Sequence, residues 1–278
     1  MKKHLYRTMT RDEVNEAVLE RRVVLIPAAA IEQHGPHLPI DTDNLIGIHI
    51  CEEAARRRPD LLVSAPAIHY GYNEHNMDFP GTISIKPQTL LNFYFDVGES
   101  FARQGFERII YVNCHGGNAQ IANLAARMVV THTPALAAMV HASQLAWEAI
   151  DEIRESRYPG GMSHAGELET SVYLYLHPEL VVKEKIQDEY PSPRMNGWFY
   201  VDMKGDCRVQ LTDIFSRNTE IGIEGAATLA SADKGEKLVE AMVTNLISIA
   251  TGFRDMEVPP RKDFRAEGAP KPDEMLPR

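Results

Sequence analysis

Apolar residues along this 278-residue chain fall into two alternating patterns. Near-continuous apolar runs, which are typical of strands buried on both faces of a sheet, occur at residues 23–31, 61–68, 108–114 and 135–142. Stretches with the spacing and length of helices occur at residues 43–58, 90–105, 118–132 and 235–253. Such alternation predicts βαβ units. We therefore expect an α/β fold, a three-layer α/β/α sandwich with a mostly parallel central sheet.

Two segments lie outside this alternation. Residues 185–222 are rich in Pro, Gly, Arg and aromatic residues, and we expect a long excursion or a small hairpin there. Residues 257–278 form a Pro-rich, charged C-terminal tail, with too little apolar surface for a core of its own. We therefore expect one domain over residues 1–256. The tail that follows is disordered, lies on the surface, or embraces a neighbouring subunit.

The composition of the chain limits which binding partners and which cellular compartment we expect. The formal net charge of −10 argues against a nucleic-acid partner. Cys51, Cys114 and Cys207 are too few and too scattered for a disulfide framework, and no C-x-x-C pair occurs. The N-terminus lacks the apolar region of a signal peptide, and no apolar run reaches the roughly 18 residues of a membrane span. We therefore expect a cytoplasmic protein that acts on a small molecule, without a nucleic-acid or membrane partner.

Polar clusters follow three of the predicted strands. They read "EQH" at residues 32–34, "HYGYNEH" at 69–75 and "NCHGGN" at 113–118. Open α/β sheets bind ligands outside the carboxyl ends of their strands, so we expect these clusters to meet at one edge. A fourth cluster, "SHAGELETS" at residues 163–171, opens a helical stretch and adds another His and two Glu.

Each cluster alone also has a purely structural interpretation. Asp43 is positioned to cap the following helix, and carboxylates near a helix start complement the helix dipole. The two glycines after His115 would suit a tight turn. All of these interpretations together would require His, Glu and Asp to gather at one sheet edge for unrelated reasons. We therefore predict a metal centre.

The candidate ligands are imidazole nitrogens and carboxylate oxygens without sulfur. This set suits Zn²⁺ and also Mn²⁺, Fe²⁺ or Co²⁺. Because the carboxylates outnumber what one catalytic zinc needs, we predict two divalent metal ions per subunit with a bridging Asp. Such a pair lowers the pKa of a shared water from about 15.7 to roughly 7, which provides a hydroxide nucleophile at neutral pH.

The motifs "EQHGPHLP", "DTD", "HYGYNEHNMDFPGTISI", "NCHGGN" and "HAGELETS" resemble those of the creatininase (creatinine amidohydrolase) family, over roughly residues 15–250. The resemblance implies the α/β/α sandwich and a homohexamer. It also implies that one metal is held by Glu32, Asp43 and His115. The other would be held by His34, Asp43 and Glu169, so that Asp43 bridges the two ions.

The resemblance also assigns roles around the metals. His164 falls at the family's catalytic His, which carries a proton to the leaving nitrogen, and His is suited to this work near neutral pH. Glu167 could be a ligand in place of Glu169, could support a ligand from behind, or could face the substrate. His37 and Asp41 lie close to the first metal ligands in sequence and could orient them.

The resemblance is weaker in the residues that would contact the substrate. In creatininase proper, a Tyr-Glu pair stands where this chain has Gly116 and Gly117, and a Trp-Asp pair precedes the catalytic His where this chain has "PGGM" (159–162). Those groups would sandwich and hold a small cationic ring, so we expect that creatinine is not the substrate. The residues expected to contact the substrate are His75, Glu74, Gly116, Gly117, Glu167 and Trp198, with Arg194, Tyr200, Lys204 and Arg208 also available in the Trp198 stretch.

We therefore predict a metal-dependent hydrolase that uses a metal-bridging hydroxide to cleave a C–N bond of a small cyclic amide or formamide. Other branches of the family open the ring of a keto-inositol or trim a peptide terminus. The alternatives are ring-opening hydrolysis of a cyclic ketone, or a non-catalytic assembly subunit stabilised by metal. A phosphoesterase is disfavoured because no Arg or Lys lies inside the motifs.

Overall fold

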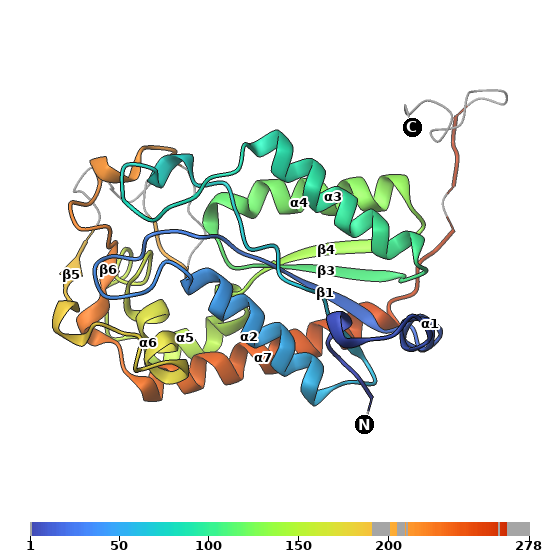
Figure 1. Cartoon of the computed structure of the whole chain (residues 1–278), viewed down its shortest axis with the longest axis horizontal. Helices are drawn as coiled ribbons and strands as arrows, with labels where there is room; N and C mark the ends of the chain where they lie inside the picture. Colours follow the sequence, from blue (N-terminus) through green and yellow to red (C-terminus); the bar gives the residue numbers. More distant parts are fainter. Residues whose placement is uncertain (1, 191–200, 205–208, 210, 261, 266–278) are drawn as a thin grey trace.

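The central sheet has four parallel strands in the order β2-β1-β3-β4, with a layer of helices on each face (Figure 1). The computed structural model describes residues 2–190, 201–204, 209, 211–260 and 262–265. The α/β/α sandwich is therefore confirmed. In chain order, the strands and α-helices of the described residues are α1 (Arg11–Leu19), β1 (Val23–Ala28), α2 (Thr42–Arg57), β2 (Leu62–Ser64), α3 (Pro87–Arg103), β3 (Arg108–Asn113), α4 (Ala119–His132), β4 (Leu136–His141), α5 (Trp147–Ile153), α6 (Glu167–Leu176), β5 (Asp188–Glu189), β6 (Gly225–Ala226) and α7 (Ala232–Asp255).

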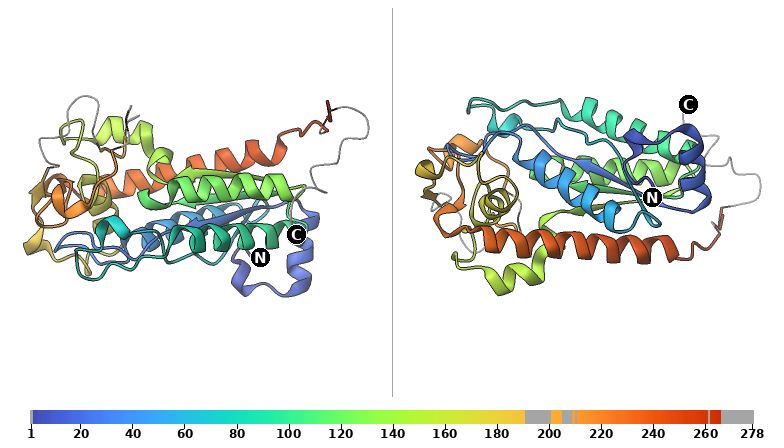
Figure 2. Two further views of the ribbon diagram at one scale, coloured as in Figure 1. Left: turned by 90° about the horizontal axis from the view of Figure 1, so that it is seen from above. Right: turned by 60° about the horizontal axis from the view of Figure 1, so that its bottom comes forward.

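Strands β1, β2 and β3 are buried on both faces, which explains their near-continuous apolar runs, whereas the edge strand β4, predicted as a buried strand, is only half-buried. Alternate residues of a strand point to opposite faces. In β1, Val23 and Leu25 pack in one core with α2 and α7, whereas Val24 and Ile26 pack in a second core with α3 and α4. All four side chains are fully buried. Figure 2 shows α7 along one face of the sheet and α3 with α4 along the other.

The winding of the chain reverses between β1 and β3. Helix α2 packs on one face and returns the chain to β2 on one side of β1, while α3 packs on the other face and leads to β3 on the opposite side. The loops that leave the carboxyl ends of β1 and β3 therefore diverge. Open α/β sheets bind ligands at such a switch point, and the "EQH" and "NCHGGN" clusters follow these two strands.

Strand β2 is shorter than the apolar run at residues 61–68 predicts. Pro66 has no backbone N–H to donate to a neighbouring strand, and regular pairing ends at Ser64. Beyond the proline, the N–H of Ile68 still donates to the carbonyl of Pro27 at 2.9 Å. The second half of the run therefore continues beside β1 as a loop that leads to the polar cluster at residues 69–75.

The remaining described segments lie outside the sheet. Strands β5 and β6 form an antiparallel pair, of which β5 lies within the predicted excursion at residues 185–222 and β6 just beyond it. In the described tail, residues 257–260 and 262–265 form no helix or strand.

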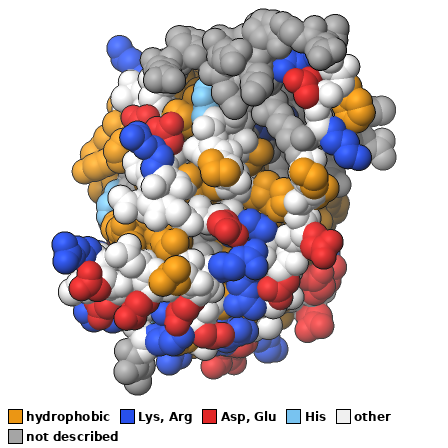
Figure 3. All heavy atoms as spheres, turned by 90° about the vertical axis from the view of Figure 1, so that its right-hand side faces the viewer, with side chains coloured by type: hydrophobic (Ala, Val, Ile, Leu, Met, Phe, Trp, Pro, Cys, Tyr) orange, Lys and Arg blue, Asp and Glu red, His pale blue; other side chains and the backbone are white. Residues whose placement is uncertain are grey.

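The surface near α1 has charges of both signs. Figure 3 shows acidic and basic side chains interspersed on this end of the molecule. Ion pairs there include Lys3 with Glu13 at 2.8 Å and Arg21 with Glu107 at 3.1 Å. Within the described ranges, no helix is long and apolar enough to cross a membrane.

Helices α6 and α7 approach each other too closely for a side chain at Gly235 of α7. A Cβ there would lie 2.0 Å from the backbone oxygen of Ser171 and 2.7 Å from the Cβ of Tyr175, both in α6. At Gly252 of the same helix, a Cβ would have no atom of the described residues within 4 Å. The packing of α6 matters for function because this helix begins inside the "HAGELETS" motif.

We expect Gly235→Ala to lower the free energy of unfolding by about 1–3 kcal/mol, because the methyl group would push α7 away from backbone atoms of α6. Gly252→Ala, the matched control, should raise it by up to about 1 kcal/mol, because alanine favours a helix and meets no neighbour. Urea denaturation followed by circular dichroism measures both changes. Equal effects of the two substitutions would contradict the close contact.

Glu224 is a buried carboxylic acid beside the β5–β6 pair. Its backbone N–H donates to the carbonyl of His164 at 2.9 Å, which joins it to the "HAGELETS" motif. Burial, with a smaller contribution from the charge of Glu189, raises the pKa of Glu224 from 4.5 to about 7. The folded protein therefore retains this proton at a pH where the unfolded chain has lost it.

Because the folded-state pKa of Glu224 is raised, its contribution should lower the free energy of unfolding by about 3 kcal/mol as the pH rises from 4.5 to 8. Glu224→Gln removes this contribution, so the variant should gain about 3 kcal/mol relative to wild type over that range. Urea titrations at pH 4.5 and pH 8 measure the change, with Glu220→Gln, at an exposed position, as the control. A difference between variant and wild type that does not change with pH would contradict the raised pKa.

Candidate metal centre

Buried His, Glu and Asp side chains from four parts of the chain gather beyond the carboxyl ends of β1 and β3. Glu32 and His34 follow β1, Asp43 lies in the first turn of α2, His115 follows β3, and Glu169 lies in the first turn of α6. All five are at most 4% exposed. Three groups have ligand atoms within 4.8 Å of one another, and these are Glu32 with His34 and His164, Glu32 with His75 and His115, and His34 with Asp43 and Glu169.

The carboxylate of Asp43 lies between two histidines. Its Oδ1 is 3.4 Å from Nε2 of His34, and its Oδ2 is 3.2 Å from Nδ1 of His115. The same His34 nitrogen lies 3.6 Å from Oε2 of Glu169, and the same His115 nitrogen lies 3.0 Å from Oε2 of Glu32. The two oxygens of Asp43 therefore face two different histidines, one on each side.

Two buried atoms of this cluster lack hydrogen-bond partners. Nε2 of His34 and Oδ2 of Asp43 have none among the described residues. Buried polar atoms are normally hydrogen-bonded or bind a metal. The unpartnered atoms and the nitrogen–oxygen donor set therefore fit divalent cations.

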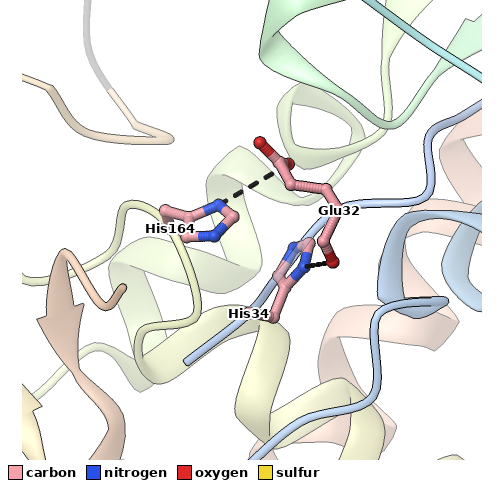
Figure 4. Close-up of side chains that lie close together, drawn as sticks. All are labelled: Glu32, His34 and His164. Carbon is pink, nitrogen blue, oxygen red and sulfur yellow. Dashed lines mark hydrogen bonds and ion pairs between the residues drawn. The ribbon is translucent and has the colours of Figure 1, made fainter. Parts of the chain in front are cut away.

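Backbone carbonyls orient the two candidate ligand histidines. Nδ1 of His34 lies 3.0 Å from the backbone oxygen of Glu32 (Figure 4), and Nε2 of His115 lies 3.1 Å from the backbone oxygen of Tyr72. A carbonyl only accepts hydrogen bonds, so each of these ring nitrogens donates an N–H. When the ring is neutral, its other nitrogen has a lone pair directed at Asp43, as a metal ligand requires.

The candidate ligand carboxylates are also held by hydrogen bonds. Nδ2 of Asn76 donates to Oε1 of Glu32 at 2.7 Å, and the N–H of Ala165 donates to Oε2 of Glu169 at 2.6 Å. Ala165 has φ of 53°, a conformation that costs energy for a residue with a Cβ. Asn76 was not among the residues predicted for the site, although it lies within the quoted motif.

The charges in the cluster shift the pKa values of its members. Burial lowers the pKa of His34, but the carboxylates of Glu169 and Asp43 outweigh burial and raise it well above 6.5. Burial likewise lowers the pKa of His115, and Glu32 and Asp43 raise it well above 6.5. Without a cation, protons on these rings neutralise the carboxylates. Metal binding would therefore release protons.

His164 lies beside the cluster with its Nδ1 turned toward it. Its Nε2 donates to the backbone oxygen of Gln33 at 2.7 Å, and its Nδ1 lies 3.8 Å from Oε2 of Glu32 (Figure 4). Burial and then the charge of His34 lower the pKa of His164 below 6.5. A neutral imidazole with a free lone pair at Nδ1 can accept a proton.

An aromatic side chain that the sequence analysis did not predict lies against His164. Phe215, in a short 3₁₀ helix (Phe215–Arg217), meets the His164 ring edge-on, with 4.9 Å between ring centroids. It also contacts Phe79 and lies near His75, with centroid distances of 6.1 and 6.4 Å. It lies within residues 185–222, where the sequence predicted only a long excursion or a small hairpin, and nothing in the pattern distinguished this residue.

Glu167, whose role the sequence left open between ligand, support for a ligand and substrate contact, is turned toward α7 and the segment that follows α5. Its carboxylate accepts the backbone N–H groups of Glu155 and Ser156 at 3.1 and 3.0 Å and pairs with Lys234 of α7 at 2.5 Å. Among the described residues, the three groups with converging ligand atoms do not include it. Both of its oxygens are used to attach α6 to α7 and to the segment that follows α5.

The residues predicted to edge the substrate pocket differ in their surroundings. Nε2 of His75 lies 3.7 Å from Oε1 of Glu32, so this side chain reaches the cluster. Glu74 is exposed. Gly116 is exposed, and a Cβ there would have no atom of the described residues within 4 Å. Gly117 is confined, because a Cβ there would lie 2.2 Å from the backbone oxygen of Tyr72.

Two other predicted residues lie away from the proposed ligand atoms. Nε2 of His37 donates to Oγ1 of Thr170 at 2.9 Å, so His37 supports α6 next to Glu169. Asp41 is exposed.

In the predicted substrate-contact stretch at residues 194–208, Lys204 pairs with Asp151. Trp198, Arg194, Tyr200 and Arg208 lie outside the described residues.

Comparison with known sequences gives matches over most of the chain. The family model described as creatininase, creatinine amidohydrolase, matches residues 7–250. A mycofactocin precursor peptide peptidase of Mycobacterium ulcerans (strain Agy99) is 30% identical over 232 residues, which cover 81% of this chain and 83% of the relative. A 3-dehydro-scyllo-inosose hydrolase of Thermotoga maritima is 28% identical over 258 residues, which cover 87% of this chain and 80% of the relative.

The fold gives the same result. A solved structure of creatininase with manganese is similar with a TM-score of 0.75 and 25% identity, over 91% of this chain and 99% of that chain. Sequence and structure therefore agree over the region that contains all five candidate ligands. The chain belongs to the creatininase family of hydrolases.

Proposed function

We propose that this protein binds two divalent metal ions and hydrolyses an amide C–N bond. The observation that supports this best is the position of Asp43, whose two oxygens face different histidine nitrogens at 3.4 and 3.2 Å. One ion would be held by Glu32, His115 and Asp43. The other would be held by His34, Glu169 and Asp43, which makes Asp43 the bridging ligand.

The donor atoms indicate which ions fit. Imidazole nitrogen with carboxylate oxygen suits Zn²⁺ and Mn²⁺, and also Fe²⁺ or Co²⁺. Manganese is present in the similar creatininase structure. Two such ions, when bound, lower the pKa of a water from about 15.7 to roughly 7 and polarise a substrate carbonyl.

His164 would move the proton that this reaction requires. The carbonyl of Gln33 holds the Nε2–H, so Nδ1 is the atom that accepts a proton from the attacking water. The carboxylate of Glu32, 3.8 Å from Nδ1, stabilises the imidazolium that results. Nδ1 then donates the proton to the leaving nitrogen, which converts a poor leaving group into an amine.

The surroundings of the site favour some amides over others. Residues 159–162 contain no aromatic or acidic side chain, which argues against a small cationic ring such as creatinine. The exposed Gly116 leaves space beside His115. This space and the similarity to a peptide peptidase support a peptide terminus, beside the small cyclic amides and formamides predicted from the sequence.

A second candidate reaction is the ring-opening hydrolysis of a cyclic ketone. It is favoured by the similarity to a 3-dehydro-scyllo-inosose hydrolase over 87% of this chain. The same residues would serve, except that an enolate rather than an amine would leave. Nδ1 of His164 would then deliver its proton to carbon.

We expect Asp43→Ala to remove both metal ions together, because both sites would lose a ligand. Asp41→Ala is the matched control, since Asp41 lies two residues away at the start of the same helix but is exposed. Inductively coupled plasma mass spectrometry after dialysis measures the ions per subunit. Two tightly held ions in Asp43→Ala would overturn the bridging role.

We expect the protein loaded with Zn²⁺ or Mn²⁺ to hydrolyse at least one amide in a panel of short peptides, cyclic amides including creatinine, formamido compounds and cyclic ketones. Mass spectrometry of the products distinguishes the reactions, because ring opening adds one water to a single product and other cleavages give two fragments. Asp43→Ala is the control for background hydrolysis. Turnover of a ketone alone would favour the second candidate. No turnover by protein with both ions bound would contradict both reactions.

A further inference from the structure

We propose that Gly117 is a positioning residue for the metal ligand His115. The absence of a side chain at Gly117 lets the backbone carbonyl of Tyr72 approach the His115 ring and hold it as the Nε2–H tautomer. The lone pair of Nδ1 then faces Glu32 and Asp43. The inference rests on the proposed metal centre for its consequence, although the tautomer itself can be measured without metal.

The space at Gly117 is already occupied by the hydrogen bond that orients His115. A Cβ on Gly117 would lie 2.2 Å from the backbone oxygen of Tyr72 and 2.6 Å from Nε2 of His115. These are the two atoms of the 3.1 Å hydrogen bond. A methyl group would therefore have to separate the donor from its acceptor.

The Tyr72 carbonyl cannot easily retreat from such a methyl group. The N–H of Tyr72 donates to Oδ1 of Asn118 at 2.9 Å, and Nδ2 of Asn118 donates to the backbone oxygen of Ala29 at 2.9 Å. Asn118 is fully buried. The backbone of His115 is held as well, because Nδ2 of Asn113 donates to its carbonyl at 2.7 Å. The "NCHGGN" motif thus fixes both partners of the hydrogen bond around Gly117.

The adjacent glycine has no such constraint. A Cβ on Gly116 would have no atom of the described residues within 4 Å. Neither Gly116 nor Gly117 has a positive φ, so alanine is compatible with the backbone at both positions. Gly116→Ala and Gly117→Ala therefore make the same chemical change one residue apart. Only in Gly117→Ala would the new methyl group clash with the two atoms of the hydrogen bond between His115 and Tyr72.

The consequence is expected at one of the two ions. In Gly117→Ala the His115 ring loses its backbone acceptor, and its Nδ1 lone pair is no longer directed at the centre. Loss of such an orienting partner typically weakens metal binding by about 10–100-fold. The ion held by Glu32 and His115 should weaken by this factor. The ion held by His34 and Glu169 should weaken less.

The experiment compares wild type, Gly116→Ala and Gly117→Ala. Zinc affinity and stoichiometry come from competition with a chromophoric chelator. Nitrogen NMR of ¹⁵N-histidine-labelled, metal-free protein, at a pH above the raised pKa of His115 so that the ring is neutral, reports the His115 tautomer, with His115→Ala used to assign the signal. We expect two ions and the Nε2–H tautomer in wild type and Gly116→Ala. Gly117→Ala should bind one ion about 10–100-fold more weakly and lose the uniform tautomer.

A double-mutant cycle separates positioning from general structural damage. If Gly117 acts through His115, then Gly117→Ala combined with His115→Ala should bind zinc no more weakly than His115→Ala alone. Additive losses, wild-type affinity in Gly117→Ala, or an Nδ1–H tautomer of His115 in wild type would each overturn the proposal. Wild type that binds no ion would instead overturn the proposed function, and the tautomer measurement would still test the role of Gly117.

Discussion

Three imidazole rings each donate one N–H to a backbone carbonyl, and the rest of the site depends on this arrangement. The carbonyls belong to Glu32, Gln33 and Tyr72 and accept from His34, His164 and His115. Because a carbonyl can only accept, each ring has one tautomer when it is neutral, and its second nitrogen then presents a lone pair toward the same small volume. The backbone of two loops therefore determines the chemistry of three side chains.

The buried carboxylates of the site, in turn, require positive charge close to them. Glu32, Asp43 and Glu169 are at most 4% exposed, and burying several carboxylates together is costly unless positive charge accompanies them. In the absence of a cation the histidines take up protons in response, as the raised pKa values of His34 and His115 indicate. A fold that buries these carboxylates together therefore favours a bound cation. The packing of α6 against α7 near Gly235 and the pairing of Glu167 with Lys234 hold the helix that carries Glu169 in place.

The periodicity of the sequence was sufficient to predict the strands of the sheet, the helices α2, α3, α4 and α7 that cover it, and the edge at which polar residues meet, but it did not predict α1 or α5. Periodicity was insufficient to predict the parts of the site that lie in loops. The carbonyl of Tyr72 and the amide of Asn76 act from a segment without regular spacing, so no pattern identifies them. Spacing alone did not distinguish Glu167 from Glu169 as a ligand, because both lie in the first turn of α6. Residues two apart on a helix point in different directions, and this rotation turns Glu167 toward Lys234 instead of the centre.

The relatives act on different compounds, a peptide precursor in one case and an inosose in another. A common centre with variable surroundings accounts for such diversity. In this chain, Phe215 lies edge-on to His164 on one side of the candidate ligands. On the other side, beside His115, Gly116 has no side chain. Neither residue contributes a ligand atom to the three candidate groups, so changes at these positions can alter which substrate approaches without altering the proposed metal centre. Under the proposed function, selection of the substrate would in this sense be separable from activation of the water. That separation explains why a motif set can identify the chemistry of a family member while leaving its substrate to the loops.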